Sequence, residues 1–187
     1  MHFNLYVIMD IFSHYVVGWM VAHRESSTLA TRLIKETSRK QGIVENQLTI
    51  HADRGTSMTF KTVIHLLADH GVTKTHNRLH VSNDNPYSES QFQTMKYRPE
   101  FPDRFGCIED SRFFLRGFFT WCNTQHRHSG IGLMTPEMVH YGKAQDIWKQ
   151  REKVSFAAAE RHPEMYTNPS CIAHTAVWID KPMDETI

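Results

Sequence analysis

The sequence predicts an α/β fold in which a β-hairpin precedes alternating strands and helices. Two apolar runs, at residues 3–10 and 15–22, are rich in strand-forming residues, and a short polar connection joins them as in a hairpin. Residues 47–76 then alternate between strand and helix patterns, which is typical of parallel α/β packing. With 40% hydrophobic and 22% charged residues, the chain of 187 residues has the composition of an ordinary globular protein with a packed core.

A helix is expected directly after the hairpin, between Ser26 and Gly42. Serine and threonine at residues 26–28 are preferred N-caps, because their side chains accept hydrogen bonds from the first unpaired amides of a helix. Glycine at position 42 is typical of a helix end. The side chains expected on the buried face are Leu29, Leu33, Ile34 and Thr37.

Two short strands and a second helix are predicted over residues 47–76. Residues 47–52 are typical of a short buried strand, which ends at Asp53. A helix is predicted over residues 59–70 and a further strand over residues 72–76. We expect these strands to lie parallel, because a helix connects them.

The remaining sequence predicts two more helices and an irregular tail. Residues 77–85 are polar without periodicity and predict a loop, and the Asn-Pro pair at residues 85–86 is typical of a helix start. Large apolar side chains at helical spacing predict a long amphipathic helix over residues 108–126. After residue 143 the apolar pattern weakens and prolines recur, so we expect an irregular tail.

Composition indicates a soluble protein of a reducing compartment. No apolar run approaches the ~20 residues of a membrane-spanning helix, and the N-terminus lacks the charged and apolar regions of a signal peptide. Three cysteines without a CxxC pair argue against a disulfide framework. The net charge of +1 neither favours nor excludes nucleic acid, because binding depends on where charges cluster.

Two carboxylates stand at positions where chemistry is possible. Asp53 follows a predicted strand and Glu89 lies in the first turns of a predicted helix, with 35 residues between them. Ligands of open α/β sheets bind at the carboxyl ends of strands, where the two carboxylates could share a hard cation such as Mg²⁺. Alternatively, Asp53 caps a turn and Glu89 interacts favourably with the helix dipole. Spacing alone favours this structural explanation, because acidic residues are common at both kinds of position.

The motifs around these carboxylates resemble those of a known family. Residues 51–55 (HADRG) and 83–89 (NDNPYSE) are similar to the last two catalytic motifs of the retroviral-integrase-like DDE transposases, whose hallmark is the same 35-residue spacing. Lys96 follows Glu89 by seven residues, as in the E-x6-K signature of the bacterial insertion-sequence branch. Seven residues span about two helical turns, so both side chains project from one face.

The resemblance extends in the same order over roughly residues 3–142. Residues 7–13 (VIMDIFS) with 17–19 (VGW) are similar to the second and third strands of that family. Residues 123–130 (NTQHRHSG) with 135–137 (TPE) are similar to its closing motif. The resemblance implies an RNase H-like fold, with a mixed sheet flanked by helices. It also implies an integrase-like catalytic core over residues 1–142, followed by an irregular tail over residues 143–187.

The chemistry that the resemblance implies is metal-dependent DNA strand cleavage and strand transfer. Asp53 and Glu89 would be catalytic residues that bind Mg²⁺ or Mn²⁺; one ion would activate water and then a DNA 3′-hydroxyl, and the other would stabilise the leaving oxygen. Lys96, Arg98 and Arg127 are the expected DNA-binding residues, with Arg112 and Arg116 as further phosphate-binding candidates.

One departure from the family pattern concerns its first catalytic aspartate, which lies on a strand before the one at residues 3–10. Residues 1–9 contain no acid, and Asp10 matches the family position beside the hairpin turn, where its side chain would stabilise the turn. We therefore expect the core to lack its first strand, and this chain alone to be inactive in strand transfer.

The expected partners are insertion-sequence terminal repeats, target DNA, further copies of the chain and a separate DNA-recognition module or subunit. The expected compartment is the bacterial cytoplasm, without membrane association. A second hypothesis is a non-catalytic transposase remnant that binds DNA or a transposase subunit, which the missing strand favours. A third is a histidine-rich metal protein, since the chain has 13 histidines, including His126 and His128; however, Cys122 gives no recognised zinc-ligand spacing with them.

Overall fold

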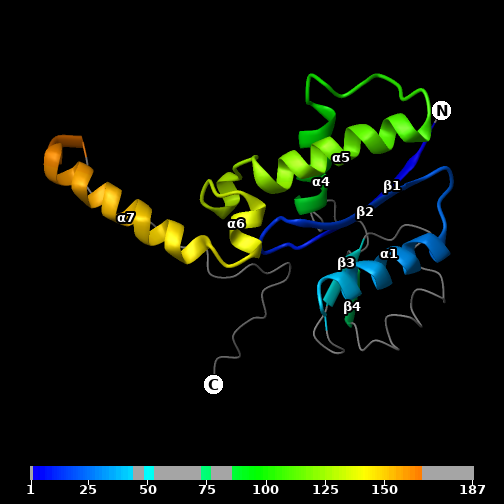
Figure 1. Ribbon diagram of the computed structural model, residues 1–187, viewed down its shortest axis with the longest axis horizontal. Helices are drawn as coiled ribbons and strands as arrows, with labels where there is room; N and C mark the ends of the chain where they lie inside the picture. Colours follow the sequence, from blue (N-terminus) through cyan, green and yellow to red (C-terminus); the bar gives the residue numbers. More distant parts are fainter. Residues whose placement is uncertain (1, 44–48, 53–72, 77–85, 166–187) are drawn as a thin grey trace. The chain divides into compact units, whose positions relative to one another are not determined.

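The computed structural model describes residues 2–43, 49–52, 73–76 and 86–165. The chain divides into two compact units. Unit 1 contains residues 1–10 and 16–119, and unit 2 contains residues 11–15 and 120–187. Figure 1 shows the elements of both units, each of which is described below by itself.

The predicted hairpin is the first feature of unit 1. Strand β1 (Asn4–Met9) pairs antiparallel with β2 (Val16–Ala22), with Asn4 opposite Ala22 and Met9 opposite Val16. The register shifts between Ile8 and Met9, which is the mark of a β-bulge. Asp10 follows the last residue of β1, so it lies at the start of the connection rather than within the strand.

A parallel pair of strands follows in the chain. Strand β3 (Thr49–Ala52) pairs with β4 (Thr73–His76), with Thr49 opposite Thr73 and Ala52 opposite His76. The parallel arrangement predicted from the sequence is thus confirmed. Within the described residues the antiparallel and the parallel pair form two separate two-stranded sheets, rather than the single mixed sheet that the resemblance implies. The predicted helix over residues 59–70 and the predicted loop over residues 77–85 lie outside the described residues.

Helix α1 (Ser27–Lys40) joins the two strand pairs through one apolar cluster. Its buried Ala30 and Ile34 pack against Tyr6 and Ile8 of β1 and against Ile50 of β3. At its start, the Ser26 amide donates a hydrogen bond to the Tyr6 hydroxyl oxygen over 2.7 Å. Past its end, Gly42 has a φ of +64°, the left-handed conformation that glycine adopts without strain. The predicted helix is confirmed, with Leu33, Ile34 and Thr37 buried as expected. Two details differ: the Ser26 side chain makes no cap hydrogen bond, and Ala30 rather than Leu29 is buried.

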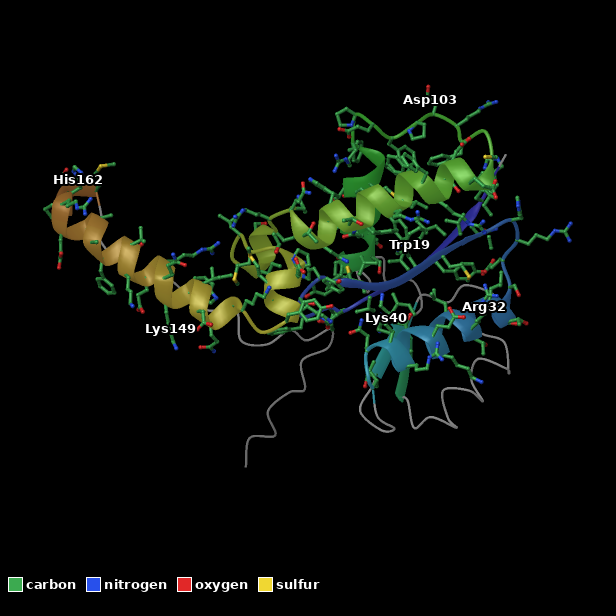
Figure 2. The ribbon with its side chains drawn as sticks, in the orientation of Figure 1. Trp19, Arg32, Lys40, Asp103, Lys149 and His162 are labelled. Atoms are coloured by element: carbon green, nitrogen blue, oxygen red, sulfur yellow. The ribbon has the colours of Figure 1, made fainter. Side chains whose placement is uncertain are left out.

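Two further helices were predicted and are present. Helix α4 (Pro86–Lys96) begins at the predicted proline, and α5 (Ile108–Thr124) ends two residues before the predicted boundary. Figure 2 labels Trp19 on β2, and its ring centroid lies 5.4 Å from that of Phe119 on α5. The buried apolar residues of α5 are Ile108, Leu115, Phe118, Phe119 and Cys122.

The described part of unit 2 is mainly helical and surrounds a small core. Its helical elements are η1 (Ser129–Ile131), α6 (Pro136–His140), α7 (Ala144–Arg161) and η2 (Pro163–Met165). The amide of Met138 donates to Thr135 Oγ1 over 3.4 Å, which caps α6. Ile131 and Met134 are fully buried in the core of this unit, and Trp148 of α7 packs against them.

The prediction of an irregular tail after residue 142 is wrong for residues 144–161. These residues form the 18-residue helix α7 (yellow to orange in Figure 1). None of its side chains is fully buried, so the regular apolar stripe that predicts a helix is weak here. The helix is instead built from strong helix formers, including three consecutive alanines at residues 157–159.

None of the helices within the described residues combines the length and the apolar character needed to cross a membrane.

Candidate active site

Helix α4 presents Glu89 to solvent in its first turn. Pro86 occupies the first helical position, where its missing amide hydrogen costs nothing because that group has no partner inside the helix. The carboxylate of Glu89 lies near the positive end of the helix dipole, which stabilises negative charge. Glu89 is exposed, so its oxygens are accessible to a cation or a substrate.

Lys96 lies on the same exposed face of α4 as Glu89. Seven residues amount to nearly two turns, which places the two side chains about 20° apart around the helix axis. Gln91 and Met95, the buried residues of α4, are centred roughly 130° away from them. The predictions that Lys96 shares a face with Glu89 and remains exposed are both confirmed.

Asp53 lies outside the described residues, so the structure does not test its position relative to Glu89. Its predecessor, Ala52, is the last residue of β3 and stands opposite His76, the last residue of β4. The two parallel strands therefore end at the same edge, which is the edge where open α/β sheets bind ligands.

Two of the predicted cationic residues already have acidic partners. The half-buried Arg98 donates from Nε to Glu100 Oε2 over 3.0 Å, and this hydrogen bond lowers the pKa of Glu100 below its ordinary value. Arg112 forms an exposed ion pair with Glu109 at 3.6 Å. These pairs reduce the positive charge that either arginine can offer to a phosphate.

Arg127 belongs to a different arrangement in unit 2, together with an arginine that the sequence analysis missed. Arg127 Nη1 donates to the Leu133 carbonyl oxygen over 3.2 Å, and Arg151 Nη2 donates to the same oxygen over 3.0 Å. Arg151 Nη1 also donates to the Gly132 carbonyl. Arg151 lies in the segment predicted as irregular, so only recognition of α7 as a helix could have placed it near residues 132–133.

Three histidine rings cluster in unit 2. The ring centroids of His126 and His128 are 4.3 Å apart, and that of His14 is 5.4 Å from His128. The pKa of His128 is lowered to about 4, mainly by burial and in addition by the neighbouring His126 and His14. Within the described residues, no three histidine, cysteine or acidic side chains are arranged to hold a metal ion, so the zinc hypothesis gains no support there.

An antiparallel hairpin and a parallel strand pair, packed on a common helix, are the architecture of an RNase H-like α/β protein. Solved structures with a similar fold support this description of the fold. The chain resembles the catalytic core domain of BIV integrase, with a TM-score of 0.56 and 19% sequence identity over 77% of this chain and 89% of that one. It also resembles a chain of the simian T-cell lymphotropic virus intasome in complex with PP2A regulatory subunit B56 gamma, with a TM-score of 0.55 and 16% identity over 74% of this chain and 48% of that one.

Sequence comparison identifies the family. One integrase core domain family model matches residues 2–81, and a second matches residues 70–136. The chain is 26% identical over 142 residues to the transposase for insertion sequence element IS904 of Lactococcus lactis subsp. lactis (strain IL1403). The chain therefore belongs to the integrase core family, and it is similar to an insertion-sequence transposase. The match covers 71% of this chain and 53% of that relative, so the chain spans about half the relative's length.

Proposed function

We propose that this chain supplies Asp53, Glu89 and Lys96 to metal-dependent polynucleotidyl transfer on DNA, the cleavage and joining of strands during transposition. The observation that carries the proposal is the shared exposed face of Glu89 and Lys96 on α4, which combines a potential metal ligand with a potential phosphate ligand. Both residues lie in the segment that matches the integrase core.

Asp53 and Glu89 are the proposed catalytic residues, and their carboxylates are the proposed ligands of Mg²⁺ or Mn²⁺. The donor set fits these ions, because both residues offer the hard oxygen ligands that Mg²⁺ prefers. When bound, the metal would activate the attacking hydroxyl group and neutralise the developing charge at phosphorus. The protein's own contribution is to hold Glu89 on a helix whose opposite side is anchored by Gln91 and Met95.

Lys96, Arg98 and Arg127 are the proposed contacts to the DNA backbone. Lys96 is the best placed of the three, because it is exposed beside Glu89 and no acidic group among the described residues pairs with it. Contacts to phosphate position the DNA without reading its sequence. The proposed partners are terminal repeats and target DNA, further copies of this chain and a separate recognition module. The proposed compartment is the bacterial cytoplasm.

Metal titration tests the proposed carboxylates directly. We expect Asp53→Asn and Glu89→Gln each to weaken Mn²⁺ binding at least tenfold, because each removes one anionic ligand from a small site. Glu36→Gln is the matched control, since Glu36 is an exposed helix carboxylate of the same unit that we place outside the site. Binding can be followed by the relaxation of water protons around Mn²⁺. Equal affinity in the wild type and in both site variants would remove Asp53 and Glu89 from the proposal.

A second candidate function is DNA binding without catalysis. The observation that favours it is the exposure of Lys96 and Arg127, two cationic side chains that can contact DNA phosphates without any metal ion. Metal-dependent joining of a labelled terminal-repeat oligonucleotide separates the two functions. Joining that Glu89→Gln abolishes would support catalysis. Binding of the same oligonucleotide without joining would support the second function.

A further inference from the structure

The Gly132–Leu133 turn of unit 2 brings two arginine side chains together. Both guanidinium groups donate to the Leu133 carbonyl oxygen, over 3.2 Å from Arg127 and 3.0 Å from Arg151. Their two donating nitrogens therefore lie no more than about 6.2 Å apart, which is the sum of these distances. Arg127 is contributed by the segment just before η1 and Arg151 by α7, so two separate elements supply the pair.

The backbone and its surroundings hold this arrangement in place. Gly132 and Leu133 both have positive φ, +66° and +54°, and a leucine in that conformation is strained. A Cβ atom at Gly132 would come within 2.7 Å of the Trp148 ring, so the ring packs directly on the turn. The guanidinium carbon of Arg151 lies 5.7 Å from the centre of the same ring. The indole, the turn and Arg151 thus form one packed set.

The two positive charges have no acidic partner among the described residues. No carboxylate there forms an ion pair with Arg127 or Arg151. The residues one turn away from Arg151 on its face of α7 are all uncharged: Ile147, Trp148, Val154 and Ser155. Two cations this close repel each other, and the two carbonyl dipoles offset the repulsion only in part. The arrangement therefore favours a bound anion.

Unused donors remain on both side chains. A guanidinium group has five N–H donors, of which Arg127 uses one and Arg151 uses two in the hydrogen bonds to the turn. Arg127 is exposed and Arg151 is half-buried, so their remaining donors can reach a ligand from solvent. Planar guanidinium groups match the geometry of phosphate oxygens, and a phosphodiester has two unbridged oxygens, one for each arginine.

We propose that Arg127 and Arg151 form a phosphate-binding site for the backbone of DNA at the Gly132–Leu133 turn. The site rests on the proposed function, since it takes DNA as the macromolecule that supplies the phosphate. It extends that function to Arg151 and α7, which lie beyond the segment matched by the integrase core models. The contact is independent of base sequence, because it is made to the backbone alone.

The test measures how the affinity for a fluorescently labelled 30-base-pair duplex of arbitrary sequence depends on salt. Each phosphate contact that is lost flattens the slope of log affinity against log salt concentration by about one unit. We expect Arg127→Gln and Arg151→Gln each to flatten this slope by about one unit, and the double variant to flatten it by about two units. Glutamine is chosen because it keeps a neutral hydrogen-bond donor for the turn. Arg151→Lys keeps the positive charge, so the salt dependence of this variant should stay close to that of the wild type.

Lys149→Gln is the matched control. Lys149 is an exposed cation of the same helix, and it lies two residues from Arg151 and so on a different face (Figure 2). It should change the slope by much less than one unit. The thermal unfolding of every variant is measured as well, so that a loss of DNA binding can be distinguished from a loss of folding.

Three outcomes would overturn the site. A double variant that binds the duplex with an unchanged slope would refute it while leaving the proposed function intact. If the double variant lost affinity for a labelled polyglutamate peptide while its DNA binding stayed unchanged, the partner of the site would be an acidic protein. A wild-type chain that binds no duplex at any salt concentration would refute both the site and the DNA partner of the proposed function.

Discussion

His128 occupies a position that disfavours its charged form. Its Nε2 atom is buried and has no hydrogen-bond partner among the described residues, and the rings of His14 and His126 lie close to it. Burial is the main reason that its pKa falls to about 4, and the two neighbouring histidines add to the effect. The ring is therefore neutral in the folded protein at every pH at which DNA transactions are ordinarily studied.

This position predicts a loss of stability in weak acid. The unfolded chain protonates His128 near its ordinary pKa of about 6.5, whereas the folded chain does so near pH 4. The contribution of the neutral ring is complete above pH 6.5 and is lost as the pH falls toward 4, because only the unfolded state takes up the proton in that window. Allowing for partial solvent screening, the loss is about 1–2 kcal/mol.

Urea unfolding at pH 7.5 and pH 4.5 measures this contribution. We expect His128→Gln to reduce the difference in free energy of unfolding between the two pH values. The control His162→Gln, at an exposed histidine 3.4 Å from Glu164, should leave that difference nearly unchanged. An identical pH dependence in the wild type and in His128→Gln would show that other groups cause it.

Helix α1 approaches β2 closely at Gly18. A Cβ atom on Gly18 would overlap Thr37 Oγ1, and Thr37 is itself only 6% exposed. Glycine is therefore required here for the space that it leaves. This close approach allows Ala30 and Ile34 of the same helix to reach β1 and β3.

Gly18→Ala should destabilise the protein by about 1–3 kcal/mol, the range typical of overpacking in a core. Gly117→Ala is the control, because Gly117 lies on the exposed side of α5 and a Cβ there meets no atom within 4 Å. That substitution should be neutral or should stabilise the helix by up to about 1 kcal/mol. Chemical unfolding compares the two, and equal stability of both variants would contradict the proposed close packing.

Elements marked by local signals were predictable from the sequence, and elements held by distant contacts were not. The N-cap serines, the proline at position 86 and alternating apolar runs predicted α1, α4 and the hairpin, because each signal acts within its own segment. Helix α7 was missed, because it lacks a regular apolar stripe and the packing of its first turns depends on Trp148 contacting a turn 16 residues earlier.

The same distinction applies to the candidate site. The shared face of Glu89 and Lys96 follows from helical geometry alone and was predicted. The pairing of Arg127 with Arg151 depends on the positive φ angles at residues 132–133, which bring the two segments together, and no local pattern indicates it.

At the scale of the whole molecule, charge is nearly balanced, with 21 basic and 20 acidic residues. General electrostatic attraction to DNA is therefore weak, and binding has to come from local groups such as Lys96 and the two arginines of unit 2. We expect the affinity to depend on a few contacts, so that single substitutions have measurable effects.

Metal binding at the proposed carboxylates should raise the stability of the whole chain. A ligand that binds only the folded state at ten times its dissociation constant adds about 1.4 kcal/mol, which corresponds to a rise in Tm of roughly 2–4 °C for a chain of this size. Differential scanning calorimetry with Mg²⁺, and again after removal of the ion by EDTA, measures the shift. Glu89→Gln should remove most of it, and an equal shift in that variant would place the ion elsewhere.

Within the described residues, the packing of α7 on the core of unit 2 lies in its first two turns. Trp148 and Arg151 tie its first two turns to the Gly132–Leu133 turn, whereas Val154 and Phe156 beyond them are 64% and 48% exposed. In the part of the chain that the structure describes, the far half packs mainly against the short η2, and isolated helices of this length are marginal in water. Amide hydrogen exchange should therefore be slowest near Trp148 and become faster toward Arg161, through local opening that leaves the core closed. Among the sites within α7, trypsin should cut first after Lys153 or Arg161, and cutting should slow when a bound partner covers that half of the helix.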